Sequence, residues 1–106
     1  MSAPQRAHPT GDLHMVTAVV LIKAETDKVP ELAEKMAELE GVTEVFSVAG
    51  QYDLVALVRV RENDDLARVI SSKMRKLPGI MGSETLISFK VYSKKDLEAG
   101  FSLGLD

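Results

Sequence analysis

A four-residue run in the middle of the chain, Gly50-Gln51-Tyr52-Asp53, combines residue types that can hold a small zwitterion. Glycine allows a positive φ angle, so a tight turn at this point can expose backbone N–H groups that bind a carboxylate. Asp53 can either pair with an ammonium group or hydrogen-bond the backbone and hold the turn. Tyr52 can cap a ligand or pack between subunits. The residues alone favour an ordinary hairpin turn, and a ligand-binding turn is the alternative.

Two hydroxyl side chains, Ser83 and Thr85, form the second candidate. Because they are two positions apart, they point to the same face of a strand. Their hydroxyl groups can bind a polar ligand beside the glycine turn, or they can be an ordinary pair at the edge of a sheet. The predicted ligand-binding residues are thus Gly50, Gln51, Tyr52, Asp53, Ser83 and Thr85.

The composition leaves little material for catalysis or metal binding. The chain has 106 residues, no cysteine and two histidines, so thiolate chemistry is excluded and a histidine-based centre is poorly supplied. We interpret the carboxylates of residues 62–65 as the start of a helix and the basic residues of 73–76 as its solvated end, since both match the helix dipole. We predict no catalytic residue, no metal and no cofactor.

The overall charge argues against direct nucleic-acid binding. Thirteen basic residues face sixteen acidic ones, a formal net charge of −3, whereas phosphate binding requires a clustered basic excess. No apolar run reaches the roughly 18 residues of a membrane helix, and the N-terminus lacks the apolar stretch of a secretory signal. We expect a cytoplasmic protein that acts by binding and does not contact a membrane.

The hydrophobic periodicity predicts elements in the order β-α-β-β-α-β. Strands are expected at 16–24, 42–49, 52–61 and 85–92, and helices at 28–40 and from residue 63 or 64 to Pro78-Gly79, with a short terminal helix at 94–99. The pattern Lys-Met-x-x-Leu-x-Gly begins at residue 35 and again at residue 73, and it marks the end of each helix. This order predicts an α+β, ferredoxin-like fold, in which an antiparallel four-stranded sheet carries both helices on one face.

The first and third predicted strands are apolar on both faces. Val19 and Leu21 alternate with the core positions of the first strand, as Val55 and Leu57 do in the third. Because two helices cover only one face, the other face would expose on the order of several hundred Å² of apolar surface. We therefore predict a homodimer in which two such faces pack against each other.

Three short motifs occur in an order and spacing that resemble the ligand-binding domain of the Lrp/AsnC family, also called the RAM domain. They are Gly50-x-Tyr52-Asp53 before an apolar strand, Leu77-Pro78-Gly79-Ile80 after the second helix, and Ser83-Glu84-Thr85 leading into the last strand. The resemblance covers roughly residues 16–92. We expect a flexible tail at 1–14, the domain at 15–93 and a C-terminal extension at 94–106. Because few residues precede the first strand, the chain resembles the stand-alone form that lacks the DNA-binding helix-turn-helix.

The resemblance implies dimers joined sheet to sheet into an α/β barrel, which can assemble further into rings such as octamers. It also implies that an amino acid or related metabolite binds at a subunit interface, held by the turn at 50–53 with Ser83 and Thr85 beside it. Such a ligand would stabilise the assembly and modulate transcription through DNA-binding Lrp/AsnC relatives.

Two other functions stay open. One is a small cofactor-free dimeric barrel enzyme, a monooxygenase or isomerase, which needs a polar cavity between the helices and the sheet. The other is a purely structural dimerisation domain, which needs no ligand.

Overall fold

The computed structural model describes residues 15–92 and residue 94, and the elements follow the predicted β-α-β-β-α-β order. The strands are β1 (Val16–Ala24), β2 (Val42–Ser47), β3 (Leu54–Val60) and β4 (Ile80–Ile87). The first helical segment joins a short 3₁₀ turn, η3 (Thr26–Lys28), to α1 (Val29–Ala37). The second joins α2 (Asn63–Ala67), a wide π turn, η4 (Arg68–Lys73), and a 3₁₀ turn, η5 (Met74–Lys76).

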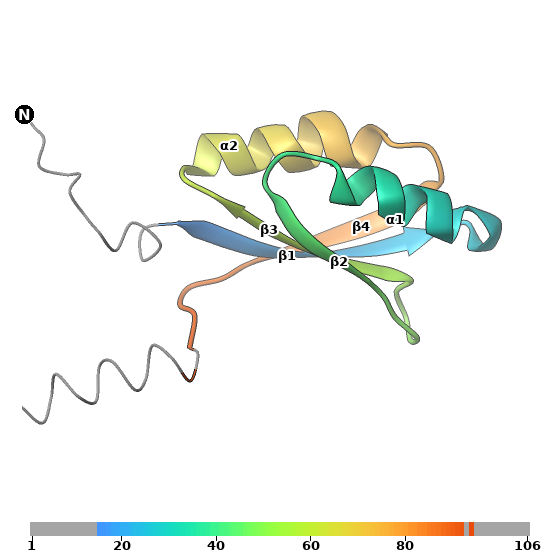
Figure 1. The fold of residues 1–106 in the computed structure, drawn as a ribbon, viewed down its shortest axis with the longest axis horizontal. Helices are drawn as coiled ribbons and strands as arrows, with labels where there is room; N and C mark the ends of the chain where they lie inside the picture. The colour runs from blue at the N-terminus through green and yellow to red at the C-terminus, as the bar shows by residue number, and fades with distance from the viewer. Residues whose placement is uncertain (1–14, 93, 95–106) are drawn as a thin grey trace, which may run out of the picture.

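The four strands form one antiparallel sheet in the order β2-β3-β1-β4. The two central strands, β1 and β3, are those with the most continuous apolar sequence. Both helical segments lie on the same face of the sheet, as Figure 1 shows. The predicted ferredoxin-like α+β fold is therefore confirmed.

The core lies between the sheet and the helices and consists of aliphatic and methionine side chains. The sheet contributes every second residue of β1 and β3, and the helices contribute apolar residues that recur at helical spacing. The helical core residues are Leu32, Met36, Leu66, Val69, Ile70 and Met74. Within the described residues no polar or charged side chain is buried. The space between the two layers is thus filled by apolar packing.

The other face of the sheet, called the open face below, is also apolar. Its apolar side chains are those of Val19, Leu21, Phe46, Val55, Leu57 and Leu86, which the strand registers place on the side away from the helices. Phe46 is 44% exposed and Leu86 47% exposed, and neither of the two helical segments that the structure describes covers this side in Figure 1. The predicted apolar character of both faces of the central strands is confirmed.

The predicted position of the last strand, 85–92, is wrong, because β4 spans Ile80–Ile87. Its partner β1 determines this position: Ala24 pairs with Ile80 and Ala18 with Ile87. The N–H of Ser88 donates to the carbonyl of Thr17 at 2.8 Å, and only Val16 precedes Thr17 in β1. The strand-forming residues beyond this point therefore have no partner strand, and Phe89 is fully exposed.

The remaining boundaries differ by a few residues. The strands predicted at 42–49 and 52–61 are shorter, because residues 48–53 form one longer connection instead of a two-residue turn. The helix predicted at 28–40 is α-helical from Val29 to Ala37. The predicted terminal helix at 94–99 and the predicted tail at 1–14 lie outside the described residues, apart from Lys94.

Candidate functional site

The connection between β2 and β3, residues 48–53, forms the predicted binding turn. The N–H of Val48 donates to the carbonyl of Asp53 at 3.0 Å and closes the loop. Gly50 has a φ of +145°, the positive value predicted for it, and a Cβ at this position would meet no atom within 4 Å. The backbone N–H groups of residues 49–52 donate to no acceptor in the described part of the chain. These amides are available to an anionic group.

Asp53 attaches this turn to the end of β1. Its Oδ2 accepts a hydrogen bond from the N–H of Ala24 at 2.8 Å, and its own N–H donates to the carbonyl of Ile22 at 2.8 Å. Of the two roles considered for Asp53, holding the turn is therefore the one for which the structure shows contacts.

Two charged side chains that were not predicted from the sequence also lie at the turn. Lys23 donates from Nζ to the carbonyl of Gln51 at 2.9 Å. The hydroxyl of Tyr52 donates to Oε1 of Glu84 at 2.6 Å, and this hydrogen bond to a carboxylate raises the pKa of Tyr52 above its ordinary value of 10.0. An ammonium group and a carboxylate thus contact residues 51 and 52, within the segment whose amides are free.

Glu84 and Lys23 lie on the open face, because their register positions alternate with the core positions of β4 and β1. The sequence contained a signal for the position of Glu84. It stands between the two predicted hydroxyl residues, so on a strand it points to the opposite face. The turn therefore lies at one end of the open face, beside the apolar surface.

Ser83 and Thr85 lie on the opposite side of β4 from Glu84. Their partners across β1 are the buried residues Ile22 and Val20, so both side chains share the face that carries the helices, and both are exposed. Ile22 also pairs with Leu54, which places Ser83 two strands, or roughly 10 Å, from the end of the turn. Within one chain, the structure groups Tyr52 with Glu84 and not with the two hydroxyls.

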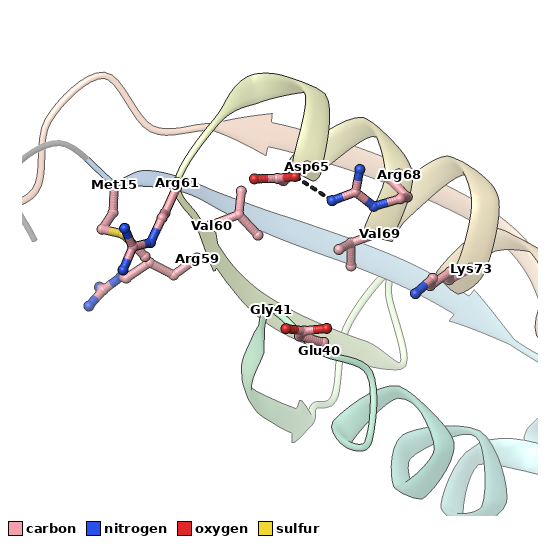
Figure 2. A pocket seen from close by; sticks show the side chains of 10 residues that line it. All are labelled: Met15, Glu40, Gly41, Arg59, Val60, Arg61, Asp65, Arg68, Val69 and Lys73. Carbon is pink, nitrogen blue, oxygen red and sulfur yellow. Dashed lines mark hydrogen bonds and ion pairs between the residues drawn. The ribbon is translucent and has the colours of Figure 1, made fainter.

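A separate hollow of about 360 Å³ lies at the other end of the sheet, where β3 leads into α2. Val60, Val69 and Gly41 contribute to its lining, and Figure 2 shows charged side chains around them. This hollow was not predicted from the sequence.

The described residues show neither a metal site nor a membrane-spanning helix. No group of three or more His, Cys, Asp or Glu side chains among them is arranged to hold a metal ion. None of the helices found among residues 15–92 is both long and apolar enough to cross a bilayer.

The arrangement matches a known protein family. The family described as the Lrp/AsnC ligand binding domain matches residues 17–97. This chain belongs to the Lrp/AsnC family. Except for Val16, the match includes all four strands and both helical segments, so the turn at 48–53 and the strand carrying Glu84 both lie inside the family domain.

Individual relatives agree with this assignment. The chain is 36% identical over 76 residues to PH1916 of Pyrococcus horikoshii, described as an uncharacterized HTH-type transcriptional regulator; the match covers 69% of this chain and 51% of the relative. The chain thus spans about half the length of the curated relatives it matches. The crystal structure of TTHA0845 from Thermus thermophilus is 43% identical, with a TM-score of 0.70 and coverage of 74% of this chain and 99% of that one.

A more distant solved structure shares the fold. It is the transcriptional regulator NMB0573 of Neisseria meningitidis in complex with L-Met, at 12% identity and a TM-score of 0.68, with 88% of this chain and 58% of that chain covered. The Lrp/AsnC domain described by residues 15–92 is thus of the ligand-binding, regulatory kind found in transcription regulators.

Proposed function

We propose that this Lrp/AsnC domain binds an amino acid or a related metabolite where its open face meets a second copy, and that binding regulates assembly without any catalysis. The observation that carries this proposal is the position of the turn at 48–53. Its free amides, the Lys23 ammonium and the Glu84 carboxylate border an apolar surface that no helix within residues 15–92 covers.

The charges suit the two ends of an α-amino acid. Free backbone N–H groups of residues 49–52, with the Lys23 Nζ close by, can hold the ligand carboxylate. Glu84 can accept from the ligand ammonium in addition to the hydroxyl of Tyr52, since a carboxylate has room for several donors. The Neisseria meningitidis protein, which has the same fold, is in complex with an amino acid, L-Met.

The open face supplies the reason for a dimer. Six apolar side chains share this face, and covering them with the same face of a second copy removes them from water without a different partner. Two sheets packed face to face, with the helices outside, correspond to the dimeric α/β barrel that the resemblance to the Lrp/AsnC domain implies. Further assembly into rings, and association with DNA-binding relatives, are part of the same proposal.

Because Ser83 and Thr85 lie on the face that carries the helices, they fit this proposal as groups supplied by a further copy, outside the pair joined by their open faces. Because they lie about two strands away and on the other face, they are poorly placed to reach a ligand held by the turn of their own chain. A ligand bound by the turn of one subunit and by these hydroxyls of another would stabilise the assembly that holds both.

The apolar core favours binding over the alternative of a small barrel enzyme. Such an enzyme needs polar groups between the helices and the sheet, where the described residues bury only apolar side chains. The HTH-type regulators among its relatives favour the same choice.

A thermal-shift screen of the twenty amino acids tests the proposal. A ligand at 100 times its Kd should stabilise the fold by about 2.7 kcal/mol. Lys23→Met and Thr85→Ala should remove most of the shift, whereas Lys35→Met, a matched change on the exposed side of α1, should keep it. If no amino acid raises the melting temperature, or if the Lys23 and Thr85 variants respond like the Lys35 variant, the proposed site is wrong.

A further inference from the structure

The hollow beside α2 has the features of a second binding site. It has a volume of about 360 Å³, within the size range of small-molecule pockets, which extends from roughly 300 to 1,000 Å³. Its lining includes the apolar side chains of Val60 and Val69, both buried, together with charged residues around them. An apolar floor with charged walls suits an organic molecule that carries a charged group.

Backbone geometry keeps the floor of this hollow open. Gly41 has a φ of +98°, and a Cβ there would lie 3.0 Å from Cγ1 of Val60 and 3.4 Å from Cγ2 of Val69. The N–H of Arg59 donates to the carbonyl of Gly41 at 2.8 Å and holds this glycine against the end of β3. A side chain at position 41 would therefore occupy the space over the floor.

The charged side chains around the hollow are mainly basic. Four cationic side chains line it against two carboxylates, although the whole chain is acidic with a formal net charge of −3. The cations are Arg59, Arg61, Arg68 and Lys73, and the carboxylates are Glu40 and Asp65. Three of the cations are arginines, whose planar guanidinium groups bind phosphate through two parallel hydrogen bonds.

The irregular second helix positions part of this group. Arg68, Val69 and Lys73 all belong to the π turn η4. In a π turn, residues five apart in sequence lie more nearly on the same side of the helix than they do in an α-helix. Figure 2 shows these three residues following one another along the helical side of the hollow, with Glu40 and Gly41 across from them. Asp65 forms an ion pair with Arg68 and orients its guanidinium group.

From this geometry we infer that the hollow binds a small phosphate-bearing metabolite of about the size of a sugar phosphate or a mononucleotide. The phosphate is held by the side chains of Arg61, Arg68 and Lys73, and the organic part rests on Val60 and Val69. The site is independent of the proposed amino-acid site. Val60 pairs with Val16 at one end of β1 and Leu54 with Ile22 at the other, so the two sites are roughly 20 Å apart.

The experiment is an NMR titration of the ¹⁵N-labelled full chain with AMP, ribose 5-phosphate, inorganic phosphate and adenosine. AMP and ribose 5-phosphate should shift the amide signals of Gly41, Arg61 and Val69, and adenosine should leave them in place. Inorganic phosphate should move the same signals more weakly, because it makes no contact with the floor. The affinity for AMP should fall with rising salt, as expected for a charge-dependent contact.

Variants with matched charge provide the decisive comparison. Arg61→Gln with Arg68→Gln should weaken AMP binding about tenfold or more, whereas Arg75→Gln with Lys76→Gln, which changes the net charge equally outside the hollow, should stay within about twofold. If the first double variant fails to fold, Arg61→Gln alone keeps the ion pair of Arg68 and should still weaken binding. Equal binding by both double variants, equal shifts with adenosine, or no shifts at the hollow would overturn the inference.

Discussion

The hydrogen bond from the N–H of Ala24 to Oδ2 of Asp53 gives a prediction about the stability of the fold. Ala24 is only 5% exposed, so its N–H has little access to water when the carboxylate is removed. Leaving a buried donor unsatisfied costs about 1–3 kcal/mol. Asp53→Ala should therefore lower the free energy of unfolding by about this amount, and the melting temperature by about 4–8 °C per kcal/mol.

A second variant separates the hydrogen bond from the charge. Asp53→Asn keeps a carbonyl oxygen that can accept from Ala24, so it should lose about half of the stability that Asp53→Ala loses, or less. Glu34→Ala serves as a control, because Glu34 is exposed on α1 and its removal should change stability by no more than about 0.5 kcal/mol.

The assay is urea unfolding followed by circular dichroism at one fixed protein concentration, since association of subunits also contributes to apparent stability. If Asp53→Ala unfolds at the same urea concentration as Glu34→Ala, then Asp53 does not hold the turn. A stable Asp53→Asn variant that no longer responds to an amino acid would assign Asp53 to the ligand as well.

Two other predictions concern the turn and its contact with β4. Gly50→Ala should destabilise the fold by about 1 kcal/mol in urea unfolding, because the φ of Gly50 is +145°. Gly82→Ala should not destabilise the fold, because Gly82 has the same free space around it and no positive φ. Equal effects of the two substitutions would contradict this explanation. Because the folded pKa of Tyr52 is raised, its bond to Glu84 should be intact at neutral pH and be lost as the pH rises through that pKa. In a Tyr92→Phe background, tyrosinate absorbance should then appear at lower pH in Glu84→Gln than with Glu84 present, and identical titrations would refute the contact.

The fold could be predicted because its core follows simple periodicities. The residues of α1 and of the second helical segment that recur at helical spacing are the ones that are buried, and alternate residues of β1 and β3 are buried in the same way. The position of β4 could not be predicted from its own residues. Residues 89–92 favour a strand as much as residues 80–84 do, and the choice between them depends on where its antiparallel partner β1 begins and ends.

The candidate site was predicted only in its local part. Gly50 and Asp53 could be selected because the backbone of a turn requires these residue types. The contacts of Lys23 with Gln51 and of Tyr52 with Glu84 join residues 28 and 32 positions apart, so they depend on the register between strands. The hollow beside α2 was missed for the same reason, since its basic residues come from the end of β3, from the connection after it and from a π turn that periodicity does not reveal.

The mass of the chain in solution, measured by light scattering at micromolar concentration, tests most directly whether a second copy covers the open face. We predict at least twice the mass of one chain for the wild type. Glu34→Lys, the control with a charge change on the exposed side of α1, should have the same mass as the wild type. Leu57→Lys, on the open face, should shift the mass toward that of a single chain. A wild-type chain that stays single at this concentration would contradict the proposed dimer.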